Sequence, residues 1–126
     1  MVWFLVGLGG ALGSMARHFV NRAIHQHALS STFPFGIFLI NVAGSFAIGL
    51  FAGIVSASRW QIPFEMRTFV IVGVLGGFTT FSSFSFDTLA LARDGHLDQA
   101  LLNVAGQVGL SLLGVWLGYK VGLLAA

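Results

Sequence analysis

The chain has 126 residues, of which 56% are hydrophobic and 8% are charged, and its mean hydropathy is +0.91. A soluble domain carries about 25% charged residues, so six basic and four acidic side chains are too few to cover a soluble protein of this length. The formal net charge of +2 argues against nucleic acid as a partner, and the absence of cysteine excludes disulfides and thiolate chemistry. The sequence therefore predicts an all-α integral membrane protein in contact with membrane lipid.

Apolar stretches long enough to cross a bilayer, which takes about 17–25 residues, follow one another along the whole chain. They are residues 2–20, 35–57, 68–92 and 100–124. No basic residue precedes the first stretch, so we interpret it as a retained membrane helix rather than a secretory signal. We expect residues 1–126 to form a single membrane domain of four transmembrane helices with short connections.

The basic residues are balanced between the two sides that four crossings define. One side holds Arg59, Arg67 and Lys120, and the other holds Arg17, Arg22 and Arg93. Orientation normally follows the Lys/Arg excess on the cytoplasmic side. The balance favours a chain that inserts both ways and pairs with itself as an antiparallel, dual-topology homodimer. The alternative is a weakly biased protein that another factor orients.

The third stretch contains a polar run, Gly-Gly-Phe-Thr-Thr-Phe-Ser-Ser-Phe-Ser-Phe-Asp-Thr, at residues 76–88. Two glycines followed by hydroxyl residues at mid-membrane favour a helix broken near Gly76–Thr80. Such a break frees carbonyl oxygens, which are suitable ligands for a hard cation such as Na⁺. The alternative is that the hydroxyl groups bond back onto their own helix.

Amide side chains recur at helical spacing on two other stretches. Asn41 lies on the second stretch, and Asn103, Gln107 and Ser111 form a stripe on the fourth. Together with the third-span hydroxyls they predict a polar lane through the protein, although hydrogen bonds between helices are an alternative use. The glycine ridges, in contrast, are interpreted as close helix packing.

Aromatic and hydroxyl side chains share one part of the third span. Phe81 and Phe84 lie three residues apart, and Thr80 and Ser83 fall on a neighbouring face. Aromatic ring edges carry partial positive charge and favour an anion. No catalytic constellation is present, so we do not expect an enzyme.

The motif Gly-Gly-Phe-Thr-Thr-Phe-Ser-Ser-Phe-Ser at residues 76–85 resembles that of the CrcB/Fluc fluoride channel family. Asn41 followed by Gly44, and the stretch 106–111, resemble the same family. The resemblance covers the whole chain and implies a passive fluoride-selective channel of the bacterial inner membrane. Such a channel exports fluoride and so lowers its cytoplasmic concentration.

The resemblance also implies roles for individual residues. Two antiparallel copies would enclose two fluoride pathways, with a structural Na⁺ between them on backbone carbonyls of Gly76 and Thr79. The family's pore residues match Asn41, Phe81 and Phe84, and its polar track matches Asn103, Gln107 and Ser111. This chain departs from the commonest pattern at Ser83, Phe86, Asp87 and Gln107, which affects side-chain detail along the track.

Two other functions remain as alternatives. A small dual-topology proton-coupled exporter would need a membrane-embedded carboxylate, and Asp87 is the only acid well inside a predicted span. A non-conducting assembly subunit would leave the hydroxyl-rich break without a purpose. Passive fluoride release from liposomes without a proton gradient distinguishes the channel from both.

Overall fold

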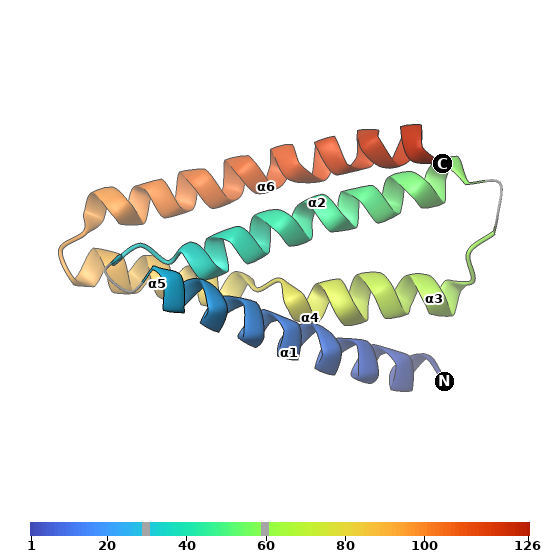
Figure 1. The fold of residues 1–126 in the computed structure, drawn as a ribbon, viewed down its shortest axis with the longest axis horizontal. Helices are drawn as coiled ribbons and strands as arrows, with labels where there is room; N and C mark the ends of the chain where they lie inside the picture. The colour runs from blue at the N-terminus through green and yellow to red at the C-terminus, as the bar shows by residue number, and fades with distance from the viewer. Residues whose placement is uncertain (29–30, 59–60) are drawn as a thin grey trace.

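The protein is described here by a computed structural model of residues 1–126, which describes all residues except 29–30 and 59–60. Long helices run side by side, and both termini lie at the same end of the molecule (Figure 1). The first two helices are α1 (Val2–His27) and α2 (Phe35–Ala57), and the last is α6 (Leu97–Ala125). Between α2 and α6 the chain forms a run of shorter pieces: α3 (Phe64–Thr68), η1 (Phe69–Leu75), α4 (Gly76–Phe78) and α5 (Phe81–Arg93).

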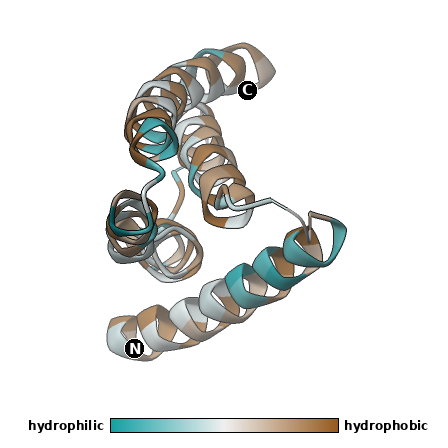
Figure 2. Cartoon of the chain, turned by 90° about the vertical axis from the view of Figure 1, so that its left-hand side faces the viewer, coloured by the Kyte–Doolittle hydropathy of each residue, from teal (hydrophilic) through white to brown (hydrophobic). Residues whose placement is uncertain are grey.

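Within the described residues, three helical segments are long and apolar enough to cross a membrane. They are Phe35–Ala57, Phe64–Arg93 and Leu97–Ala125. Helix α1 is not among them, although it has 26 residues. Figure 2 shows that its second half, which includes Arg17, His18 and Arg22, is distinctly more hydrophilic than its first half. The described residues therefore form an all-helical, multi-pass membrane protein.

The helix bounds differ from the predicted spans mainly at the ends. Helix α1 continues to His27, and the third segment begins at Phe64 because a short helix precedes the apolar stretch. Pro63 ends the preceding connection and stands immediately before that helix, where its fixed φ and missing N–H are tolerated. Arg59, one of the basic residues in the predicted charge balance, lies outside the described residues.

Glycines allow α2 and α6 to approach at backbone contact distance. A Cβ atom at Gly49 would overlap the carbonyl oxygen of Val115, and one at Gly118 would overlap that of Phe46. Close approach of this kind maximises dispersion contacts where no hydrophobic driving force acts between helices. The packing interpretation of these glycines is therefore confirmed.

Helix α1 also packs through glycines, against η1 and α4 of the segment between α2 and α6. A Cβ atom at Gly9 would lie 2.9 Å from the Cα atom of Gly73, and one at Gly13 would lie 2.8 Å from the amide nitrogen of Phe78. A Cβ atom at Gly77 would lie 2.6 Å from the carbonyl oxygen of Gly10. These contacts hold α1 directly beside the interruption in the third segment.

Few apolar side chains are buried within the single chain. The buried cluster comprises Ile37, Ile40 and Phe84, with Val20 and Phe78 packed against it. Large hydrophobic side chains such as Leu39, Phe81 and Leu101 are exposed. In a soluble protein such exposure would be unfavourable, but lipid tails solvate these side chains.

Candidate functional site

The third helical segment is interrupted at Thr79 and Thr80. Both residues have extended backbones, with φ/ψ of −82°/157° and −155°/117°, and α5 begins directly after them. Gly76 and Gly77, in contrast, are helical. The predicted break near Gly76–Thr80 is therefore present, and within this range it lies at Thr79 and Thr80, whereas the helical Gly77 packs against Gly10 of α1.

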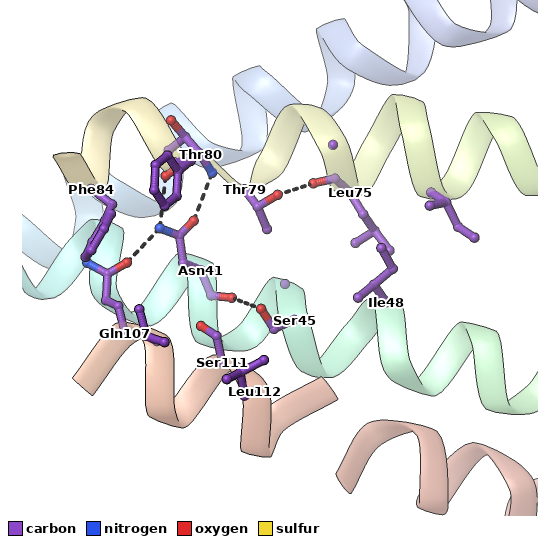
Figure 3. A pocket seen from close by; sticks show the side chains of 15 residues that line it. Asn41, Ser45, Ile48, Leu75, Thr79, Thr80, Phe84, Gln107, Ser111 and Leu112 are labelled. Atoms are coloured by element: carbon purple, nitrogen blue, oxygen red, sulfur yellow. Dashed lines mark hydrogen bonds between the residues drawn. The ribbon is translucent and has the colours of Figure 1, made fainter. Parts of the chain in front are cut away.

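The side chain of Asn41 on α2 replaces a backbone bond that the break removes and adds a second bond to the same residue. Its Oδ1 accepts from the N–H of Thr80 at 2.9 Å, and its Nδ2 donates to the carbonyl oxygen of Thr80 at 3.0 Å. In a continuous helix the N–H of Thr80 would donate to the carbonyl of Gly76. The bonds between Asn41 and Thr80 (Figure 3) hold the backbone at Thr80 in its extended conformation. Because the Thr80 N–H donates to Asn41, the Gly76 carbonyl lacks that donor.

A chain of amide hydrogen bonds continues from Asn41 onto α6. Asn41 Nδ2 donates to Gln107 Oε1 at 2.7 Å, and Gln107 Nε2 donates to Asn103 Oδ1 at 2.9 Å. Asn103 Nδ2 then donates to the hydroxyl of Thr88 on α5 at 3.0 Å. Asn103 and Gln107 are buried, with 0% and 4% of their surface exposed. This series of hydrogen bonds has one direction, because Asn41, Gln107 and Asn103 each donate to the next member, ending at Thr88.

The hydroxyl groups after the break form a second, local network. Thr80 Oγ1 accepts from the N–H of Ser83 at 3.1 Å, which caps the N-terminus of α5, and it lies 3.1 Å from Ser83 Oγ and 3.2 Å from Ser82 Oγ. Thr79, Ser85 and Thr88 instead donate to the carbonyl four residues earlier. The run therefore divides: some hydroxyls bond back onto the helix, as the alternative interpretation held, and Thr80, Ser82 and Ser83 form a cluster.

A cavity of about 430 Å³ lies between α2, the interrupted segment and α6 (Figure 3). Its polar lining side chains are Asn41, Ser45, Thr79, Thr80, Gln107 and Ser111. No charged side chain of the described residues lines it. Apolar parts of its wall include Ile48, Leu75 and Leu112.

The hydrogen bonds of the described residues show which donors this cavity can offer. Both N–H groups of Asn41 are used, by Thr80 and Gln107. Gln107 uses one of its two N–H groups, and the hydroxyl of Ser111 makes no hydrogen bond within the described part of the chain. The spare N–H of Gln107 and the Ser111 hydroxyl are thus the groups free to bind an anion.

Phe81 and Phe84 line the same cavity from α5. Their ring centroids are 5.4 Å apart, with planes inclined at 46°. Phe84 is 8% exposed and belongs to the core, whereas Phe81 is 76% exposed. The Phe84 ring is therefore held by packing within this chain, whereas the Phe81 ring extends from its surface.

A second cavity of about 510 Å³ lies beyond the break, between α1, α2 and α5. Ser83 lines it, while Thr80 lines the first cavity, so the Thr80–Ser83 hydroxyl pair stands between the two. Asn21 Oδ1 and Asp87 Oδ2 are buried in this region with no hydrogen-bond partner among the described residues.

Helix α1 contributes donors to carbonyl groups at the break. Arg17 Nη1 donates to the carbonyl oxygen of Thr79 at 3.1 Å, and Ser14 Oγ donates to that of Gly77 at 3.5 Å. Sequence reasoning assigned neither residue to the site. Their position three residues apart on one helix face could have indicated a shared partner.

The structure brings most of the predicted site residues together. Asn41, Thr80, Phe81, Phe84, Gln107 and Ser111 line the first cavity together with Gly76 and Thr79. Ser83 and Asn103 do not line it, and each lies one hydrogen bond away from a residue that does. Sequence reasoning also missed Thr88 as the last acceptor of the amide chain, although Thr88 belongs to the polar run.

The apolar helical segments, the interruption in one of them and the cavity beside it define a multi-pass membrane protein with polar side chains buried between its helices. A family model described as CrcB-like protein, Camphor Resistance (CrcB), matches residues 4–119, and the chain belongs to this family.

Relatives with known names cover nearly the full chain. A protein of Paramagnetospirillum magneticum named fluoride-specific ion channel FluC is 52% identical over 120 residues, 94% of this chain and 93% of its own. A protein of the same name from Opitutus terrae is 47% identical over 125 residues, 97% and 94% of the two chains. One from Thermus thermophilus, also so named, is 44% identical over 120 residues, 95% and 92% of the two chains. The family predicted from the motif at residues 76–85 is thereby confirmed.

Proposed function

We propose that this chain is a passive fluoride-selective ion channel that exports fluoride and lowers its concentration in the cytoplasm. The observation that carries the proposal is the spare N–H of Gln107 and the Ser111 hydroxyl in a cavity without a charged side chain. Fluoride is strongly hydrated, so a pathway must replace its lost water with donors. Donors without a fixed positive charge bind the ion weakly enough to release it, which conduction requires.

The named relatives support the same function, because each is called a fluoride-specific ion channel. These relatives are channels rather than enzymes, in agreement with the expectation from the sequence. The Phe81 and Phe84 rings line the cavity from α5, and their positive edges would attract an anion there. They would narrow the lane and exclude larger hydrated ions.

The proposed active form is an antiparallel homodimer in the bacterial inner membrane, in which α1 is the fourth crossing of each copy. Two features support a partner copy. The balanced basic residues favour both orientations, and Phe81 is 76% exposed although it lines the cavity. A second copy would cover this ring and complete the wall of the lane.

A structural Na⁺ at the centre of the dimer is the proposed cofactor, bound by the carbonyl oxygens of Gly76 and Thr79 from each copy. These oxygen ligands suit a hard cation. The Thr80 N–H that would bond to the Gly76 carbonyl in a continuous helix bonds to Asn41 instead, and the break frees the Thr79 carbonyl. Thr79 already accepts from Arg17, but a carbonyl oxygen has two lone pairs. When bound, the cation would tie two interrupted helices together.

The channel is tested by fluoride efflux from liposomes that contain the purified protein. We expect rapid fluoride release driven by its own gradient, with no proton gradient imposed and with valinomycin present to balance charge. Chloride-loaded liposomes serve as the selectivity control. Release that requires an opposing proton gradient would favour the proton-coupled exporter, and absence of release would overturn the channel.

A further inference from the structure

The guanidinium group of Arg17 lies at the carbonyl that the proposed cation would also use. Arg17 Nη1 donates to the Thr79 oxygen at 3.1 Å in a partly buried position. The only ion pair among the described residues joins Arg93 and Asp94, so no carboxylate neutralises Arg17 there. A full positive charge is thus directed at a freed backbone oxygen.

The position of this charge is imposed by packing. A Cβ atom at Gly13, one turn before Arg17, would lie 2.8 Å from the amide nitrogen of Phe78. Helix α1 therefore touches the backbone of the interrupted segment immediately before Thr79. Ser14, on the same face as Arg17, reaches the Gly77 carbonyl at 3.5 Å. The packing therefore fixes the Arg17 backbone within reach of the break, and the Nη1–Thr79 bond directs the guanidinium to it.

We infer that Arg17 sets the cation affinity of the break, because its guanidinium and the bound Na⁺ share the carbonyl oxygen of Thr79. The inference rests on the proposed function, since it concerns the cation assigned there. Two positive charges on one oxygen would be about 5 Å apart, where repulsion is large compared with thermal energy even at an effective dielectric constant of about 20. Arg17 therefore weakens Na⁺ binding, and by linkage Na⁺ weakens the Arg17–Thr79 bond.

Weakened binding has a consequence for assembly. The proposed cation joins two copies, so its affinity controls how firmly the two interrupted helices are tied. In a newly inserted single copy, Arg17 satisfies the Thr79 carbonyl that no cation yet occupies, because a buried unpaired carbonyl is costly in lipid. Arg17 thus stabilises the break before assembly and lowers cation affinity after it.

The experiment measures the Na⁺ concentration that gives half-maximal thermal stabilisation of the purified full-length protein, with choline chloride keeping the ionic strength constant. Arg17→Gln removes the charge and should lower this concentration by about tenfold or more, equivalent to about 1.4 kcal/mol. Arg17→Lys retains the charge and should stay closer to the wild type. Ser14→Ala is the matched control, because it removes a neutral donor from the neighbouring carbonyl, and it should change the concentration by less than about threefold.

A wild-type measurement keeps the inference testable if Arg17→Gln does not fold. The ¹⁵N resonance of the Arg17 guanidinium should shift as Na⁺ is added and should not shift with choline. No shift, or an Arg17→Gln protein that binds Na⁺ no more tightly than the wild type, would overturn the inference. If the wild type itself shows no Na⁺ stabilisation while fluoride efflux is normal, the cation and this inference both fail and the channel stands.

Discussion

Asn41 and Thr80 exchange two hydrogen bonds across the space between α2 and the interrupted segment, at 2.9 and 3.0 Å. A single amide side chain thus mimics the backbone partner that an unbroken helix would supply. All the polar hydrogens of Asn41 are used in the protein, by Thr80 and Gln107. Asn41 therefore positions the break and begins the series of amide hydrogen bonds that leads to Thr88.

Asn41→Asp should reduce fluoride efflux by about tenfold or more, equivalent to about 1.4 kcal/mol of barrier. The carboxylate cannot donate, so it faces the Thr80 carbonyl and Gln107 Oε1 as a third acceptor and adds negative charge to the anion's path. Thr68→Ala is the control, because Thr68 does not line the cavity and, among the described residues, its hydroxyl bonds only to the Phe64 carbonyl of its own segment. Efflux at the wild-type rate from Asn41→Asp liposomes would remove Asn41 from the pathway.

Phe81→Ile and Phe84→Ile should each lower fluoride efflux by about tenfold or more, but they should differ in stability. Phe84 is 8% exposed and Phe81 is 76% exposed. Phe84→Ile should therefore destabilise the protomer by about 1–2 kcal/mol through imperfect repacking, whereas Phe81→Ile should act on flux and on dimer contacts.

Thermal unfolding and efflux measured on the same preparations separate the two effects of the phenylalanine variants. Phe64→Ile is the control, since Phe64 is 67% exposed and lies outside the site. Wild-type efflux in both site variants would show that these rings do not line the pathway.

Ser111→Ala removes a donor that makes no internal bond in the described part of the chain, whereas Gln107→Leu removes a donor that also holds the amide series together. Ser111 makes no hydrogen bond within the described residues, so its loss should lower efflux several-fold and leave the unfolding temperature unchanged. Gln107→Leu leaves an Asn41 N–H and Asn103 Oδ1 unpaired, which costs about 1–3 kcal/mol for each buried group. An unchanged efflux rate in Ser111→Ala would exclude its hydroxyl as an anion donor.

Gly44→Ala should displace the break and reduce efflux, because a Cβ atom at Gly44 would overlap the Cγ2 atom of Thr79. The Thr79 side chain is held by its bond to the Leu75 carbonyl at 2.9 Å and cannot easily rotate away. Gly7→Ala is the matched control, because nothing lies within 4 Å of its Cβ position. Equal efflux from the two variants would show that the break tolerates movement of Thr79.

Gln61→Lys combined with Ile62→Lys should bias every copy to place the connection between α2 and α3 on the cytoplasmic side. If the antiparallel pair is the active form, this variant alone should not conduct. Co-expression with a copy biased the other way, by Asp94→Lys and His96→Lys, should restore efflux. Conduction by the first variant alone would overturn the inverted pair.

The sequence by itself determined the class of the protein and predicted most of the polar side chains that line its first cavity. Low charge and long apolar stretches leave only a helical membrane protein, because lipid requires every backbone group to be bonded internally. The second helix occupies the predicted residues Phe35–Ala57. The hydroxyl run predicted the break, because polar groups persist in a bilayer only where they have partners.

Only the tertiary structure decided which polar groups form hydrogen bonds with one another and which residues form the break. The sequence placed the break near Gly76–Thr80, and the structure locates it at Thr79 and Thr80 within that range, while Gly77 packs against Gly10. Arg17 is 62 residues from Thr79 in the chain, and Asn41 is 66 residues from Gln107. Local patterns carry no information about such pairings, because they depend on the distances between helices that glycine contacts set.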